Sequence, residues 1–136
     1  MAPLLAWALA QILKIPFSFD RQNGFDFTRL VSVGGMPSAH SALVTSLATI
    51  TGLHSGWRSP LFGVAFVVAV TVMYDAAGIR QAAGDQAKVL NQMMREWKAS
   101  KSFRNVALRE LLGHTPVEVF VGALIGVLIA VAVSSF

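Results

Sequence analysis

The 136-residue chain has no cysteine, and only 13% of its residues are charged. The absence of cysteine excludes disulfides and metal sites built from thiolates. Soluble domains carry roughly 25% charged residues, so this low charged fraction, together with 54% hydrophobic residues, indicates a membrane protein. The length suits one domain, and the lack of internal repeats and long linkers predicts a single domain over residues 1–136.

The net charge of +4 does not indicate a nucleic-acid-binding protein. The basic residues are concentrated in particular loops, and in a membrane protein such a concentration is a signal of topology. The N-terminus differs from a signal peptide, since it lacks a basic first region and its apolar run contains Gln11 and Lys14. We therefore expect it to belong to the mature protein.

Four apolar segments stand out, and they cover residues 2–17, 38–53, 60–77 and 117–136. A helix needs about 20 residues to cross a bilayer, with a range of roughly 17–25. The pattern predicts an all-α membrane protein, a compact bundle of about four transmembrane helices. Because the first two segments are short, helices that are buried or that enter only half of the membrane are the alternative for them.

A polar stretch over residues 78–113 separates the third and fourth apolar segments. It has the apolar spacing of a helix, with Ala83, Leu90, Met94 and Trp97 along one face. Basic side chains occupy much of the remaining surface. This pattern predicts an amphipathic interfacial helix with its apolar side in the membrane and its basic side toward anionic lipid. An ordinary amphipathic helix packed on the bundle is an equal alternative.

The charge distribution predicts an orientation in the membrane. With four crossings, the loops 18–37 and 78–113 lie on one side, and the termini and the loop around Trp57 lie on the other. Apart from candidate phosphate ligands, the first side carries Arg29, Lys88, Arg95, Lys98, Lys101 and Arg104. The second side carries Arg58 alone. The positive-inside rule then places the first side in the cytoplasm or its organellar equivalent.

The polar residues that are able to do chemistry fall at the ends of the apolar segments, all on that same side. Ionisable groups at membrane depth are costly and usually functional, so this convergence is the main argument for a site. The residues concerned are Lys14, Arg21, Ser38, His40, Asp75, Arg80, Arg109, His114 and Glu118.

Ser38 and His40 lie where a glycine-containing loop enters the second apolar segment. Helix N-termini attract phosphate through unpaired N–H groups and the positive end of the helix dipole. Glycines allow the backbone to approach an anion closely. The pattern therefore predicts a phosphate site with a hydroxyl and an imidazole beside it. For His40 taken alone, a structural hydrogen-bonding role is the alternative.

His114 and Glu118 lie four residues apart, so on a continuous helix they face the same way. The carboxylate would then hold the imidazole in one tautomer and raise its nucleophilicity. A capping box between Thr115 and Glu118 is the competing interpretation, and the two roles are compatible. Asp75 and Arg80 are poorly spaced for pairing on one helix. We expect Asp75 to meet a cation of another helix, either to brace the site or to take part in catalysis.

The motifs resemble those of a known superfamily, the type-2 phosphatidic acid phosphatases and vanadium-dependent haloperoxidases, which carry K-x6-R-P, P-S-G-H and S-R-x5-H-x3-D. Lys14 and Arg21 have the spacing of the first motif, with Gln22 in place of its proline. Residues 37–40, Pro-Ser-Ala-His, match the second motif with alanine in place of glycine.

The third motif is the most altered. Arg109, His114 and Glu118 resemble it, with one residue missing between arginine and histidine, Leu108 in place of serine, and glutamate in place of aspartate. The runs GGMPSAHSALVT, MYDAAGIRQAAG and LLGHTPVEV are similar to a small divergent bacterial and plastid branch of the superfamily. The resemblance extends over nearly the whole chain.

The resemblance implies a role for each residue. His114 would attack phosphorus and form a phosphohistidine, His40 would protonate the leaving oxygen, and Glu118 would orient His114. The phosphoryl oxygens would be held by Lys14, Arg21, Ser38 and Arg109. Arg80 would supply the missing cation if the shortened spacing turns Arg109 away. The chemistry implied needs no metal and no cofactor.

The activity implied is that of an integral membrane phosphatase in a bacterial inner membrane or plastid membrane. Its substrate would be a phospholipid or a prenyl phosphate or pyrophosphate. The superfamily's enzymes usually have six spans and many work on the outer face, whereas this sequence favours four spans and a cytoplasmic site. The altered third motif supports an alternative, a non-catalytic lipid- or phosphate-binding membrane protein. Nothing in the sequence indicates a soluble haloperoxidase.

Small residues recur along the fourth apolar segment, and they allow helices to approach closely. The same positions would serve either a homodimer or contacts within one subunit. They are Gly122, Ala123, Gly126 and Ala130.

Overall fold

The computed structural model describes residues 1–17, 35–98 and 113–135, and it does not describe the side chains of residues 17, 79–81 and 96–98. The described part of the chain is helical, which confirms the predicted all-α fold. Its elements are α1 (Ala2–Phe17), α2 (Ala39–Ser55), α3 (Pro60–Ala77), α4 (Ile79–Lys98) and α5 (Pro116–Ser134).

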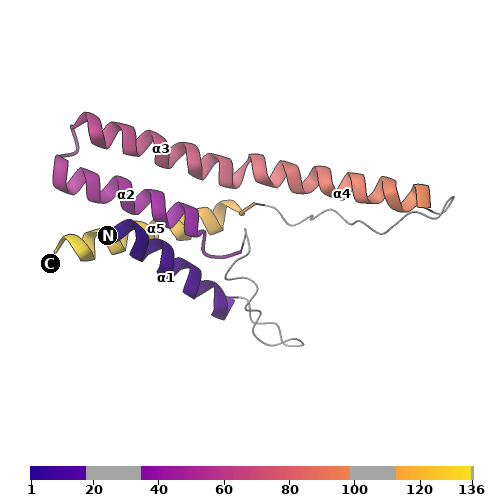
Figure 1. Ribbon diagram of the computed structural model, residues 1–136, viewed down its shortest axis with the longest axis horizontal. Coiled ribbons are helices and arrows are strands. Elements are labelled where there is room, and N and C mark those ends of the chain that lie inside the picture. The colour runs from indigo at the N-terminus through magenta and orange to yellow at the C-terminus, as the bar shows by residue number, and fades with distance from the viewer. Residues whose placement is uncertain (18–34, 99–112, 136) are drawn as a thin grey trace.

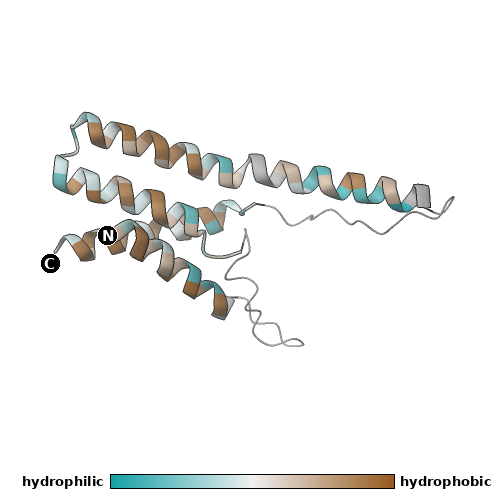
Figure 2. Ribbon diagram, in the orientation of Figure 1, coloured by the Kyte–Doolittle hydropathy of each residue, from teal (hydrophilic) through white to brown (hydrophobic). Residues whose placement is uncertain are grey.

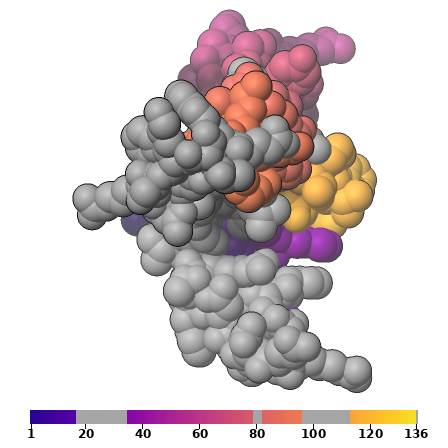
Figure 3. Space-filling view, turned by 90° about the vertical axis from the view of Figure 1, so that its right-hand side faces the viewer, coloured from indigo at the N-terminus to yellow at the C-terminus, as the bar shows by residue number. Residues whose placement is uncertain are grey.

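Helix α2 lies at the centre of the bundle and packs against α1, α3 and α5 (Figure 1). Helix α1 also packs against α5. Among the described helices, α4 contacts only α3, and it continues the direction of α3 past the end of the bundle. Figure 3 is turned toward that end and shows α4 standing in front of α3 and α5.

Local sequence sets the helix starts. The hydroxyls of Ser38, Ser59 and Thr115 each accept a hydrogen bond from a backbone N–H of the first helical turn, so each satisfies a donor that the helix leaves unpaired. Pro60 and Pro116 occupy the first helical position, where the missing N–H of proline costs no hydrogen bond. The three helices therefore begin where the capping chemistry of the sequence requires.

The interior is built from small side chains. One cluster joins α1 to α2 through Ala6, Ala10, Ala39 and Ala42, with Ile125 and Ile129 of α5 packed against it. A second joins α2 to α3 through Val44, Ala48, Ala65 and Ala69. Large apolar side chains lie outside instead, and bulky exposed residues run along α3 and α5 (Figure 2). The outer surface of the bundle is thus the apolar one.

Helices α2 and α5 approach most closely at two glycines. A Cβ on Gly122 would collide with the Ser38 carbonyl, and a Cβ on Gly126 would collide with the Thr45 hydroxyl and the Ala42 carbonyl. The Thr45 hydroxyl donates to the Ala123 carbonyl of α5 at 3.1 Å, and it also donates within its own helix to the Ser41 carbonyl at 2.7 Å. The glycine pair lets the two backbones come within hydrogen-bonding reach of each other.

Within the described ranges, two helices are long and apolar enough to cross a membrane, one within residues 60–95 and the other α5. Only 18% and 22% of their most apolar windows are buried, which distinguishes them from core helices of a soluble domain. The predicted segments 2–17 and 38–53 form α1 and α2, whose lengths are 16 and 17 residues. Two spanning helices are therefore supported, and four crossings stay a prediction.

We expect Gly126→Ala to lower the free energy of unfolding by about 1–3 kcal/mol, because overpacking forces two backbones apart. Thermal unfolding in detergent, followed by circular dichroism, measures the effect. Gly63→Ala is the matched control, since a Cβ on Gly63 of α3 meets no atom within 4 Å. Equal stability of the two variants would show that the α2–α5 contact does not require glycine.

Candidate active site at the start of α2 and α5

Two backbone hydrogen bonds fasten the site residues to three helices. The Ser38 N–H, just before α2, donates to the Glu118 carbonyl in the first turn of α5 at 3.0 Å. The His114 N–H, just before α5, donates to the Ala76 carbonyl at the end of α3 at 3.0 Å. Segments far apart in the sequence therefore meet at one end of the bundle.

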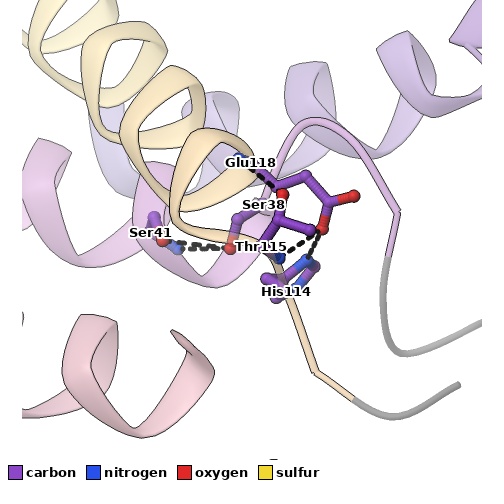
Figure 4. Close-up of polar contacts among 5 residues, drawn as sticks. All are labelled: Ser38, Ser41, His114, Thr115 and Glu118. Atoms are coloured by element: carbon purple, nitrogen blue, oxygen red, sulfur yellow. Dashed lines mark hydrogen bonds and ion pairs between the residues drawn. The ribbon is translucent and has the colours of Figure 1, made fainter. Parts of the chain in front are cut away.

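The Glu118 carboxylate joins His114 to the start of α5 (Figure 4). Its Oε2 lies 3.1 Å from His114 Nδ1, and it accepts a hydrogen bond from the Thr115 N–H, also at 3.1 Å. The Thr115 hydroxyl in turn accepts from the Glu118 N–H at 3.3 Å, which completes a capping box. The two interpretations of Glu118 drawn from the sequence, as a helix cap and as a partner of His114, are both present.

Opposite an ionised Glu118, the contact at Nδ1 favours one tautomer of the His114 ring. An ionised carboxylate only accepts hydrogen bonds, so Nδ1 carries the proton that it donates to Glu118. In the neutral ring, Nε2 then holds an unshared electron pair. Only 2% of His114 is exposed, and its buried Nε2 has no hydrogen-bond partner among the described residues. Buried polar atoms are normally paired, so Nε2 is suited to meet a ligand atom.

His40 and Lys14 lie beside this pair. The His40 ring centroid is 6.3 Å from that of His114, with the ring planes inclined by 60°. Lys14, at the end of α1, is 4% exposed and lies near enough to Glu118 and His114 for their charges to interact. The cluster thus holds two imidazoles, a carboxylate and a buried cation taken from α1, α2 and the start of α5.

Burial lowers the pKa of His114 below the ordinary value of 6.5. The Glu118 carboxylate opposes this effect through its hydrogen bond and its charge, while the charge of Lys14 lowers the pKa further. The nearby backbone of Gly35 also raises the pKa of His114. Nε2 is nevertheless too poorly placed for a hydrogen bond to any described residue. The burial effect prevails, so the ring is neutral at physiological pH.

Ser38 is fully buried at the N-cap of α2. Its Oγ accepts from the Ser41 backbone N–H at 3.3 Å and from the Ser41 hydroxyl at 3.0 Å. A serine hydroxyl has two acceptor sites and one donor, so the Ser38 O–H remains to donate. The predicted phosphate ligand is therefore also a helix cap.

The structure brings five of the nine predicted site residues together. It places one outside the cluster and does not describe the side chains of the other three. Lys14, Ser38, His40, His114 and Glu118 form the cluster. Asp75 lies in the last turn of α3, next to the residue whose carbonyl holds His114, and it is half-buried. The remaining predictions fall outside the description: Arg21 and Arg109 entirely, and Arg80 in its side chain.

Sequence reasoning missed two contributors to this site. The Ser41 hydroxyl holds Ser38, and its signal was a second hydroxyl three residues after the N-cap, facing the same way on the helix. The Ala76 carbonyl holds the His114 backbone, and a carbonyl leaves no signal in the sequence. In the described ranges, no group of three or more His, Cys, Asp or Glu gathers around a metal-sized position.

Comparison with known proteins identifies the family. The chain belongs to the divergent PAP2 family, whose model matches residues 1–129. It is 39% identical to the Uncharacterized membrane protein YuiD of Bacillus subtilis (strain 168) over 147 aligned residues, covering 100% of this chain and 93% of that protein. No solved structure matches the chain. The predicted membership of a divergent branch of the phosphatidic acid phosphatases is confirmed, and the protein is a PAP2-related membrane protein.

We expect the His114 ring to titrate below pH 6.5. As the pH falls through 6.5, the unfolded chain takes up a proton that the folded chain does not, so the stability contributed by the neutral ring is complete above 6.5 and decreases below it. NMR of histidine-labelled protein in micelles measures the titration, with His114→Gln to assign the resonance. A titration midpoint above 6.5 would contradict the assigned environment.

Proposed function

We propose that the protein is a membrane phosphatase that hydrolyses a lipid phosphate or pyrophosphate through a phosphohistidine on His114. The observation that supports it most is the buried His114 ring, with Nδ1 on Glu118 and Nε2 without a partner among the described residues. A histidine oriented in this way by a carboxylate is an activated nucleophile.

In the first step, the electron pair of His114 Nε2 attacks phosphorus and the bond from phosphorus to the leaving oxygen breaks. His40 supplies the proton to that oxygen as general acid. Water then attacks the phosphohistidine, His40 accepts the water proton, and the phosphorus–nitrogen bond breaks to release phosphate and neutral His114. Glu118 stabilises the positive ring in both steps.

Charge on the phosphoryl oxygens would be stabilised by the positive ends of two helices and by Lys14. The N-termini of α2 and α5, capped by Ser38 and Thr115, lie close together because the Ser38 N–H donates a hydrogen bond to the Glu118 carbonyl. The Ser38 O–H would add a donor. Arg21, Arg109 and Arg80 are the further cations that the family motifs imply.

The surroundings favour a lipid substrate. Val117 and Phe120 in the first turns of α5 are 63% and 64% exposed, so apolar surface begins directly beside His114. An acyl or prenyl chain would lie on this surface while its phosphate reaches the polar cluster. Phosphatidic acid, phosphatidylglycerol phosphate and prenyl pyrophosphates all meet this description.

We further propose that four helices cross a bacterial inner membrane or plastid membrane and that the site faces the cytoplasm. The basic residues of the site end support this orientation through the positive-inside rule. The end carrying Trp57 and Arg58 would then face the opposite compartment.

Replacement of each histidine tests the catalytic roles. We expect His114→Asn to reduce phosphate release to background and His40→Asn to reduce it by about 10²–10⁴-fold, the usual contribution of a general acid. Release of phosphate from the three lipid classes by purified protein in detergent is the measurement. His54→Asn is the control, because His54 is exposed at the opposite end of α2.

Two outcomes would count against the proposal. Full activity of His114→Asn would exclude the phosphohistidine. No phosphate release from any substrate, with lipid still bound, would favour the non-catalytic lipid-binding alternative.

Single cysteines test the orientation, since the chain contains no cysteine of its own. Ser55 and Gln92 are exposed at the two ends of the molecule. We expect Ser55→Cys to react with a membrane-impermeant maleimide in intact cells, and Gln92→Cys to react only after permeabilisation. The reverse labelling pattern would place the site on the outer face.

A further inference from the structure

Helix α4 has an exposed apolar stripe. Val89, Leu90 and Met93 are 56%, 48% and 60% exposed, and Ala82 and Ala83 on the same side are exposed as well. Figure 2 shows hydrophilic and apolar residues mixed along this helix, whereas α3 is mostly apolar until its last turns. Contiguous exposed apolar side chains mark an interaction surface.

The other faces of α4 are already accounted for. Gly84, Ala87 and Asn91 are buried within the chain. Asp85 borders the stripe, one turn before Val89, and it forms an exposed ion pair at 2.8 Å with Lys88, which lies farther round the helix. The stripe is therefore a separate surface that the described residues of one chain leave uncovered.

The stripe has the spacing of a coiled-coil seam. Residues 83, 86, 90 and 93 follow one another at steps of 3, 4 and 3, and the sequence extends the pattern by steps of 4 to Ile79 and Trp97. Such alternation keeps one seam facing a second helix along its length. Val89 and Ala82 flank the seam on one side and widen it.

The position of α4 favours a protein partner over the bilayer. The 18 residues of α3 rise about 27 Å, close to the 30 Å thickness of the hydrocarbon core. Because α4 continues in the same direction (Figure 1), Leu90 lies roughly 15 Å beyond the start of α4, past a headgroup layer of about 6 Å. On a straight α3–α4 rod that crosses the membrane along its normal, Leu90 and Met93 lie beyond the lipid, whereas the start of the seam lies at headgroup level.

A second copy of the chain is the partner that fits. Two copies inserted in one membrane with the same orientation present α4 in parallel and at the same height, and confinement to the bilayer raises their effective concentration. In a parallel pair each seam residue meets its own counterpart, so Leu90 packs on Leu90 and Met93 on Met93. The amide of Gln86 would meet its copy in the seam.

We propose that α4 pairs with α4 of a second copy as a short parallel coiled coil outside the membrane. The proposal rests on the proposed crossing of the membrane by α3, and it is independent of the proposed phosphatase activity, since it uses no site residue. It also differs from a dimer through the small residues of α5, because Gly122, Gly126 and Ala130 are buried within one chain.

Disulfide cross-linking in native membranes tests the pairing in a chain without other cysteines. We expect oxidation of Leu90→Cys to give at least roughly tenfold more covalent dimer than oxidation of Gln92→Cys, because seam positions face their counterparts and outer positions do not. Gln92 is a matched control, exposed and two residues away. Leu90→Asp should convert the wild-type dimer to monomer by light scattering in detergent, with unchanged helical circular dichroism.

Maleimide labelling of Leu90→Cys in the same membranes separates the other outcomes. Protection from the reagent without cross-linking would mean that the bilayer or another part of the same chain covers the stripe, and it would overturn the proposal. Free labelling without cross-linking would show an unpaired α4 and overturn it equally. A monomeric wild-type protein at all concentrations would do the same.

Discussion

The rest of the site depends on one carboxylate oxygen. Oε2 of Glu118 accepts the Thr115 N–H that begins α5 and lies against Nδ1 of His114 at the same 3.1 Å distance. The same oxygen atom therefore caps the start of α5 and orients the His114 ring. A glutamate at this position reaches back over the helix start, as capping boxes require, and this explains how the chain departs from the family's aspartate without losing the partner of the histidine.

The second constraint is the approach of α2 to α5. Gly122 faces the Ser38 carbonyl, and the Ser38 N–H bonds the Glu118 carbonyl one turn earlier. Because His40 is two residues from Ser38, the spacing of these two helices also sets the distance between the imidazoles. The close contact of α2 and α5 therefore affects both the stability of the bundle and the geometry of the proposed chemistry. It acts through backbone contacts, which a change of side-chain rotamer cannot adjust.

Local patterns in the sequence predicted much of this molecule. The apolar segments that begin at residues 38, 60 and 117 predicted helices that begin at residues 39, 60 and 116. The three-residue step from Thr115 to Glu118 predicted the capping box, and the four-residue step from His114 to Glu118 predicted the contact between these two side chains. Local patterns could not predict the tertiary contacts. The hydrogen bond from the His114 N–H to the Ala76 carbonyl joins two backbones, and the complete burial of Ser38 depends on neighbouring helices. The interfacial position expected for residues 78–113 stays a prediction, and the pairing of α4 outside the membrane is the competing proposal, since α4 runs on from α3 with its apolar stripe exposed.

The central claim is that His114 Nε2 is the atom that accepts the phosphoryl group. Rapid quenching of the purified protein during turnover of a lipid labelled with ³²P in its terminal phosphate tests it most directly. The account predicts protein-bound label that is stable to alkali, lost in acid, and located by mass spectrometry on Nε2 of His114. Turnover with no bound label, or label on His40 or any other residue, would contradict it.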